Sequence, residues 1–161
     1  MKQEISICWF RRDLRLNDNS ALYYALRSPY PVLPIFIFDP EILDKLTDKS
    51  DKRVSFIYET IQTLNLQCQD HGSSFYVVYD RVEDAFKNLI EQFDVKNIFL
   101  NHDYEPYAIN RDRTIQHLAE AEGIGFHTFK DQVIFERSEV MKADGLPYTV
   151  FTPFSKRWRQ L

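Results

Sequence analysis

Short apolar runs alternate with amphipathic stretches along the first 130 residues of the chain. Runs that are apolar at consecutive positions and bounded by polar or glycine-containing segments predict buried strands, here over residues 5–10, 32–39, 74–79, 97–100 and 126–129. Between the runs, apolar residues three or four positions apart predict helices over about 20–27, 51–70, 82–93 and 107–122.

Buried strands that alternate with helices are typical of a parallel sheet covered on both faces, with right-handed crossovers. The pattern predicts an α/β fold: a doubly wound, Rossmann-like, five-stranded parallel sheet with helices on both faces. We expect residues 1–130 to form this core. Residues 131–161 lose the alternation, and their aromatic and basic end at 151–158 has no partner strand in view, so we expect a connector there.

The composition narrows the possible functions. The chain has 161 residues, 44% hydrophobic and 27% charged, as in a typical globular domain. With a formal charge of −4, the chain lacks the positive field that sequence-independent nucleic-acid binding needs.

Two cysteines without paired spacing, Cys8 and Cys68, fit a reducing compartment. No run has the character of a signal peptide or the length of a membrane span, so we expect a cytoplasmic protein that does not bind a membrane.

Charged residues follow the predicted strands, and ligands of parallel sheets bind outside the carboxyl ends of the strands. Asp39, Asp103 and Glu105 are therefore expected to share one rim with Arg11 and Arg12. Such a rim offers both donors and acceptors to a polar heterocycle, and it lacks the free backbone N–H groups that phosphates prefer. Spacing alone leaves a second interpretation open, in which these charges only neutralise one another at the sheet edge.

Other chemistries have little support in the sequence. The four histidines have no metal-ligand spacing, so we expect no metal. No serine lies in a nucleophile elbow, and no glycine-rich phosphate loop is present. A free-standing nucleotide-binding or nucleotidyl-transferring domain stays as an alternative, but the segment after the first strand has neither a glycine loop nor a histidine pair.

Three motifs, in order along the chain, resemble those of the DNA photolyase and cryptochrome family. They are WFRRDLRLNDN at 9–19, NHDYEPY at 101–107 followed by Arg111 and Asp112, and YTVFTPF at 148–154 with Lys156 and Trp158. The resemblance extends over the whole chain and is closest to deoxyribodipyrimidine photolyases. It covers only the family's N-terminal α/β antenna domain.

The resemblance implies a role in light harvesting. Residues 1–130 would hold an accessory chromophore that passes excitation energy to FAD, and FAD would then split pyrimidine dimers in UV-damaged DNA. Residues 131–161 would lead to a helical FAD-binding domain that this sequence lacks and that docks near Phe151–Trp158. This fragment alone would then be inactive and would contain no catalytic residue. The antenna domain of a cryptochrome, a blue-light photoreceptor, is the alternative, because both groups share the N-terminal motifs.

The resemblance also implies cofactor-binding positions. Members that bind a deazaflavin or FMN as antenna use positions that correspond here to Arg12, Phe38, Asp39, Lys52, Arg53, Asp103 and Glu105, and we add Asn101, which opens the second motif. Folate-binding members carry Asn-Glu where this chain has Tyr107-Ala108, so a folate is disfavoured. For Lys52 and Arg53, a solvated charge pair with Asp48 or Asp51 is the alternative to a binding role.

Overall fold

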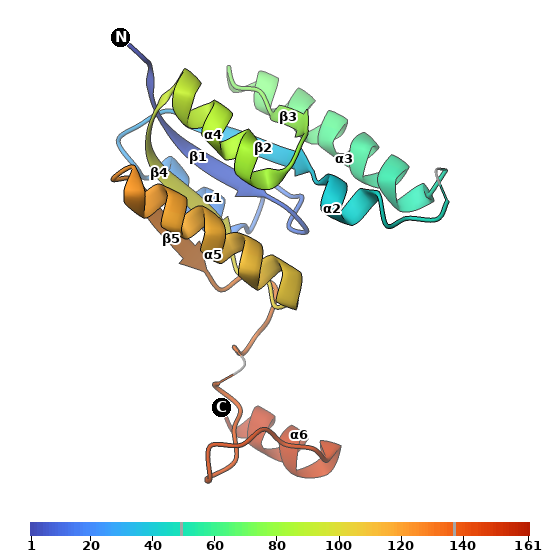
Figure 1. The fold of residues 1–161 in the computed structure, drawn as a ribbon. Helices are drawn as coiled ribbons and strands as arrows, with labels where there is room; N and C mark the ends of the chain where they lie inside the picture. Colours follow the sequence, from blue (N-terminus) through green and yellow to red (C-terminus); the bar gives the residue numbers. More distant parts are fainter. Residues whose placement is uncertain (49, 137) are drawn as a thin grey trace. The chain divides into compact units, whose positions relative to one another are not determined.

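The computed structural model describes residues 1–48, 50–136 and 138–161. The chain divides into two compact units, Met1–Phe129 and Lys130–Leu161 (Figure 1). The first unit contains the sheet and the helices that cover it. No helix in the described ranges is both long enough and apolar enough to span a bilayer.

The first unit is built on a five-stranded sheet in which every pairing is parallel, and this confirms the predicted fold class. The strand order is β3-β2-β1-β4-β5, so the direction of winding reverses between β1 and β4. Such a reversal leaves a crevice at the carboxyl ends of the two strands. The strands are β1 (Glu4–Phe10), β2 (Val32–Phe38), β3 (Tyr76–Tyr79), β4 (Asp94–Asn101) and β5 (Gly125–Phe129).

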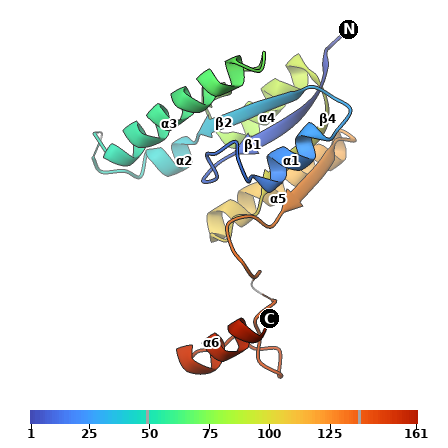
Figure 2. The ribbon, with the colours of Figure 1, turned by 180° about the vertical axis from the view of Figure 1, so that it is seen from behind.

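Helices cover both faces of the sheet, because the strands carry apolar side chains on both sides. Ile7 and Trp9 of β1 belong to the core cluster beneath α4 (Val82–Gln92) and α5 (Pro106–Ala121). Cys8 and Phe10 belong to the cluster on the opposite face, beneath α1 (Ser20–Leu26) and α3 (Lys52–Gln69). Figures 1 and 2 show these two helix pairs from opposite sides.

Three short segments differ from the sequence prediction. Strand β3 begins at Tyr76 and not at residue 74. Strand β4 begins at Asp94, earlier than predicted, because Asp94 and Val95 pair with Glu4 and Ile5 across a bulge. Helix α2 (Pro40–Leu43) was not predicted at all, since four residues are too few for a periodic pattern. Its signal was the Asp39-Pro40 pair, in which Asp39 is the N-cap and Pro40 the first helical residue.

The second unit contains a helix that the sequence pattern also missed, α6 (Phe151–Gln160). Apolar periodicity predicts helices that bury one face, and α6 buries none of its residues. Within this unit Trp158 packs edge-on against Phe135, with ring centres 5.6 Å apart. Met141 and Pro147 form an isolated antiparallel bridge.

A buried amide ties the loop after β1 to the end of β4. Asn101 is 1% exposed, and its Nδ2 donates to Asp13 Oδ2 at 2.6 Å and to Asn19 Oδ1 at 2.9 Å. Its Oδ1 accepts from the backbone N–H of Ala21 at 2.9 Å. Asp13 in turn accepts from the N–H of Arg11 at 2.8 Å. These bonds fix the path of the chain that carries Arg11 toward the crevice between β1 and β4.

Removal of this amide takes hydrogen bonds from buried polar groups. We expect Asn101→Ala to lower the free energy of unfolding by about 2–3 kcal/mol, because the Ala21 N–H loses its partner and the buried Asp13 carboxylate loses its 2.6 Å bond while it keeps the one from the Arg11 N–H. Urea denaturation followed by tryptophan fluorescence measures this loss. Asn97→Ala, on the same strand, is the matched control, since Asn97 is only half-buried and its side chain makes longer hydrogen bonds, 3.4 Å to Ser6 and 3.0 Å to His127. Equal losses in the two variants would contradict the assignment.

Candidate functional site

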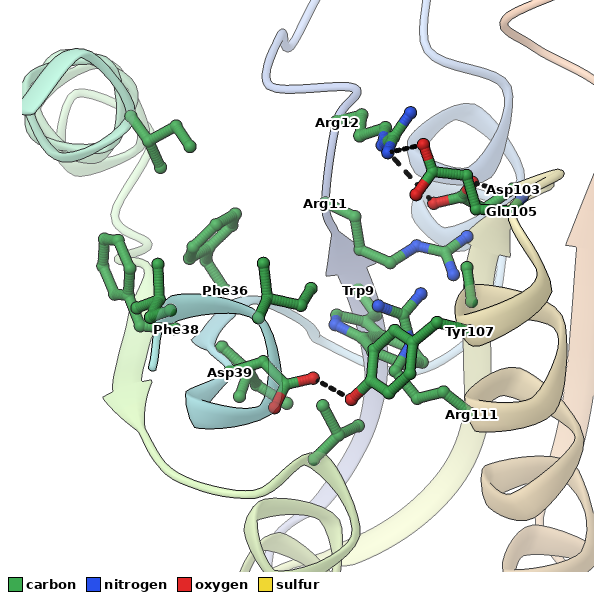
Figure 3. A pocket seen from close by; sticks show the side chains of 16 residues that line it. Trp9, Arg11, Arg12, Phe36, Phe38, Asp39, Asp103, Glu105, Tyr107 and Arg111 are labelled. Atoms are coloured by element: carbon green, nitrogen blue, oxygen red, sulfur yellow. Dashed lines mark hydrogen bonds and ion pairs between the residues drawn. The ribbon is translucent and has the colours of Figure 1, made fainter. Parts of the chain in front are cut away.

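A pocket of about 220 Å³ lies at the carboxyl ends of the central strands, beside the reversal of strand order. Side chains from β1, β2, α2, α3, α4 and α5 and from the loops after β1 and β4 line it (Figure 3). Its apolar walls come mainly from Trp9, Phe36, Phe38, Ile42, Leu43 and Ile57. Parallel sheets bind ligands at this position, so the pocket is the candidate site.

One polar edge of the pocket is built around Arg12. Its Nη2 donates to Glu105 Oε1 at 2.5 Å, and its Nε lies 3.7 Å from Asp103 Oδ2. The hydrogen bond with Glu105 and the charge of Asp103 raise the pKa of Arg12 above its ordinary value. The Asp103 carboxylate is itself held by the backbone N–H groups of Tyr104 and Glu105. The edge therefore presents a fixed guanidinium with two carboxylates.

A second polar edge joins the start of α2 to the start of α5. Asp39 is 5% exposed, and its Oδ1 accepts from the backbone N–H of Glu41 at 3.0 Å. The hydroxyl of Tyr107 donates to the other carboxylate oxygen of Asp39, as Figure 3 shows. Burial and the neighbouring Asp39 raise the pKa of Tyr107. The hydroxyl consequently keeps its proton and acts as a donor.

Two arginines lie beside the indole ring of Trp9. The guanidinium carbons of Arg11 and Arg111 are 4.9 Å and 4.8 Å from the ring centre, within the range of cation–π attraction. Asp112 bridges the two arginines, with Oδ2 2.5 Å from Arg11 Nη1 and Oδ1 2.9 Å from Arg111 Nη2. The three side chains are between 9% and 17% exposed, so this group is largely shielded from solvent.

The structure brings together most of the residues that the sequence predicted for the site. The five that line the pocket are Arg12, Phe38, Asp39, Asp103 and Glu105. Asn101 does not line it, because its amide is used in the buried network below the rim.

Lys52 and Arg53, at the start of α3, do not line the pocket either. The side chain of Arg53 is 75% exposed and donates to Asp51 Oδ2 at 2.6 Å. Hydrogen bonds from Arg53 lower the pKa of Asp51 to about 2. In the structure Arg53 therefore adopts the local charge pair that was the alternative to a binding role.

Sequence analysis placed Arg11 on the rim without a binding role, and it did not assign Trp9, Tyr107 or Arg111 to the pocket. Trp9 belongs to a strand pattern and was assigned only to the core. Tyr107 and Arg111 are four positions apart, and residues with this spacing share one face of a helix. Since Pro106 places the start of α5 at the rim, this spacing was the available signal.

The pocket combines flat apolar walls with guanidinium and hydroxyl donors and with carboxylate acceptors. This arrangement suits a planar heteroaromatic ligand whose edges carry hydrogen-bonding groups. Over the described parts of the chain, no three or more His, Cys, Asp or Glu side chains are grouped so that they could hold a metal ion.

Known proteins resemble this chain over nearly all of its length. The sequence model of the DNA photolyase family matches residues 6–161. A deoxyribodipyrimidine photolyase of Alkalihalophilus pseudofirmus is 30% identical over 93% of this chain, which spans 32% of that protein. Cryptochrome-1 of Arabidopsis thaliana is 31% identical over 94% of this chain, which spans 22% of that protein.

A solved structure agrees with this assignment. The archaeal photolyase of Sulfolobus tokodaii superposes with a TM-score of 0.82 and 31% identity, over 99% of this chain and 35% of that one. It is described as containing two FAD molecules, with the implication of a novel light-harvesting cofactor. The chain thus spans about a third or less of the length of these relatives. From the family match, the sequence identity and the fold together, this chain belongs to the DNA photolyase family.

Proposed function

We propose that this chain is the antenna domain of a light-driven DNA repair enzyme, a deoxyribodipyrimidine photolyase. Its pocket binds a flavin-like chromophore, and the chromophore passes excitation energy to FAD held by the C-terminal domain of the complete protein. FAD supplies the chemistry that splits pyrimidine dimers in UV-damaged DNA. The observation that carries the proposal is the apolar pocket with mixed polar edges at the reversal of strand order, in a chain of this family.

The walls and edges of the pocket favour a deazaflavin or FMN. Both contain a flat tricyclic ring, which matches the apolar walls around Trp9 and Phe38, and both have donors and acceptors along one ring edge. Asp39 accepts and Arg12 donates at the pocket edges. The description of the Sulfolobus tokodaii photolyase, with its second FAD, supports a flavin as the ligand class.

A reduced folate is disfavoured at the same place. Folate-binding members use an Asn-Glu pair where this chain has Tyr107 and Ala108. Here the Tyr107 hydroxyl is engaged with Asp39, and Ala108 is 3% exposed and carries no polar group. Neither residue supplies the amide and carboxylate of that pair.

In this proposal the chain's own residues bind and orient the chromophore and keep water from it, and none is catalytic. The second unit, with its exposed Phe151 and the basic Arg157 and Arg159 near the end of α6, provides the docking region for the C-terminal FAD domain. DNA binding and repair take place on that domain, and the complete protein works in the cytoplasm.

A cryptochrome is the second candidate, and its support is specific. Cryptochrome-1 of Arabidopsis thaliana matches this chain at 31% identity, about the same as the photolyases. By overall identity, the chain is therefore as compatible with a light-signalling protein as with a repair enzyme.

Substitution of the buried carboxylate at the pocket edge tests ligand binding. We expect the chain to bind riboflavin, FMN or a 5-deazaflavin saturably and more tightly than a reduced folate. Asp39→Asn keeps the helix cap but removes a charged acceptor, so we expect it to weaken flavin binding about tenfold or more. Equilibrium dialysis gives the dissociation constants.

Asp51→Asn is the matched control for this experiment. Asp51 is also a helix N-cap and accepts from the N–H two residues ahead, as Asp39 does, but it lies outside the pocket. Its substitution should leave flavin affinity unchanged. Equal affinities for wild type and Asp39→Asn, or a folate that binds most tightly, would argue against the proposal.

A genetic test separates repair from signalling. We expect the complete gene that encodes this chain to restore survival of a photolyase-deficient bacterial strain after UV irradiation, under blue light and not in the dark. Colony counts under the two light conditions provide the measurement. Expression of the protein without light-dependent rescue would contradict repair and favour the cryptochrome.

A separate measurement tests the third alternative. Stabilisation of the purified chain by ATP would favour a free-standing nucleotide-binding domain.

A further inference from the structure

A second cavity of about 240 Å³ adjoins the candidate site. It lies between the start of α2, the start of α4 and one side of α5. Four residues line both cavities: Asp39, Val82, Tyr107 and Arg111. The two spaces are therefore neighbours that share one wall.

The shared wall is closed by one hydrogen bond. Tyr107 reaches from the first turn of α5 to Asp39 at the start of α2, and its hydroxyl donates to the Asp39 carboxylate (Figure 3). Lys45 Nζ lies 5.6 Å and the Arg111 guanidinium carbon 5.7 Å from the Tyr107 ring centre. A single hydrogen bond shifts an equilibrium on the order of fivefold to tenfold, so a ligand with modest binding energy is able to displace it.

The charges around the second cavity do not favour a phosphate. Asp39, Glu41 and Glu83 contribute three carboxylates, and Arg81 and Arg111 contribute two guanidinium groups. A phosphate in this cavity would face a negative balance, and charge-assisted pairing would not compensate for it.

The same cavity is well supplied with groups that suit hydroxyls. The two guanidinium groups donate and the carboxylates accept. The amide of Asn110 and the hydroxyl of Thr114, which also line the cavity, do both. Donors and acceptors that alternate over a short distance match an uncharged chain in which each hydroxyl both donates and accepts.

The sizes of the cavities point in the same direction. Sites for complete small-molecule ligands have volumes of about 300 Å³ or more, and each cavity is smaller than that. Each therefore accommodates part of a ligand, and the two together accommodate a ring with an attached chain.

We propose that the two cavities form one bipartite site, in which the first takes the ring of the chromophore and the second takes an uncharged polyhydroxyl chain attached to it. Tyr107 is the residue that determines specificity, because its side chain separates the two compartments. This inference rests on the proposed function and adds to it the chemical class of the ligand's side chain.

Three flavins that differ only in the side chain test the inference. Lumiflavin carries the ring alone, riboflavin adds the polyhydroxyl chain, and FMN adds a phosphate to that chain. We expect the wild-type chain to bind riboflavin about tenfold more tightly than lumiflavin and FMN no more tightly than riboflavin, as measured by equilibrium dialysis.

Thr114→Trp fills the second compartment from an exposed position of α5. We expect this substitution to weaken riboflavin binding to the level of lumiflavin binding. The dissociation constant of lumiflavin should change by less than about twofold. Thr63→Trp is the matched control, because Thr63 is an exposed helix residue whose hydroxyl donates to the carbonyl four residues back, as that of Thr114 does. This control substitution should leave the dissociation constants of riboflavin and lumiflavin unchanged.

Tyr107→Phe removes the hydrogen bond that closes the wall. The ratio of the lumiflavin to the riboflavin dissociation constant should then rise about fivefold. Circular dichroism verifies that each variant is folded.

The possible outcomes separate the inference from the proposed function. Equal binding of lumiflavin and riboflavin, unaffected by Thr114→Trp, would overturn the bipartite site and leave flavin binding in place. If FMN bound tenfold more tightly than riboflavin, the second cavity would be a phosphate site and not a compartment for an uncharged polyhydroxyl chain. Failure of all three flavins to bind would refute the proposed function, and the inference with it.

Discussion

The side-chain amide of Asn101 is the constraint on which the site depends. It lies at the end of β4. Its partners Asp13 and Asn19 belong to the segment between β1 and α1, and its partner Ala21 belongs to the first turn of α1. Because buried polar groups must be paired, this segment has one acceptable position against β4. The crevice at the reversal of strand order therefore has a fixed edge, from which Arg11 and Arg12 extend.

The acidic residues of the pocket are positioned by the backbone before any ligand arrives. Asp39 accepts from the N–H of Glu41, and Asp103 accepts from the N–H groups of Tyr104 and Glu105. Carboxylates held in this way lose little side-chain entropy on binding, and preorganisation of this kind raises affinity without additional contacts. Asp39 and Asp103 are consequently preorganised acceptors at the rim, and the Tyr107 hydroxyl is held there by its hydrogen bond to Asp39.

The sequence predicts the strands, from periodicity, and the residues that follow strand ends. It does not predict whether a given side chain points into the pocket, into the protein or toward a neighbour in the sequence. The sheet was predictable because its strands bury both faces, and Asp39, Asp103 and Glu105 were found because they follow strands. Asn101 occupies the same kind of position, but it points into the protein. Arg53 turns to Asp51 because the two residues are only two positions apart in the sequence. No motif encodes these orientations, since packing and local hydrogen bonds decide them.

The two arginines beside Trp9 have a consequence for an antenna. An indole next to an excited ring is able to quench it by giving up an electron, and the indole that remains is a cation. The guanidinium groups of Arg11 and Arg111, less than 5 Å from the ring centre, oppose that positive charge, and the low dielectric of a shielded site strengthens the effect. Asp112 carries one negative charge against their two, so it reduces this opposition without cancelling it. Within the proposed function, the charges around Trp9 therefore disfavour electron transfer from the indole and leave energy transfer to FAD as the favoured path of the excited chromophore.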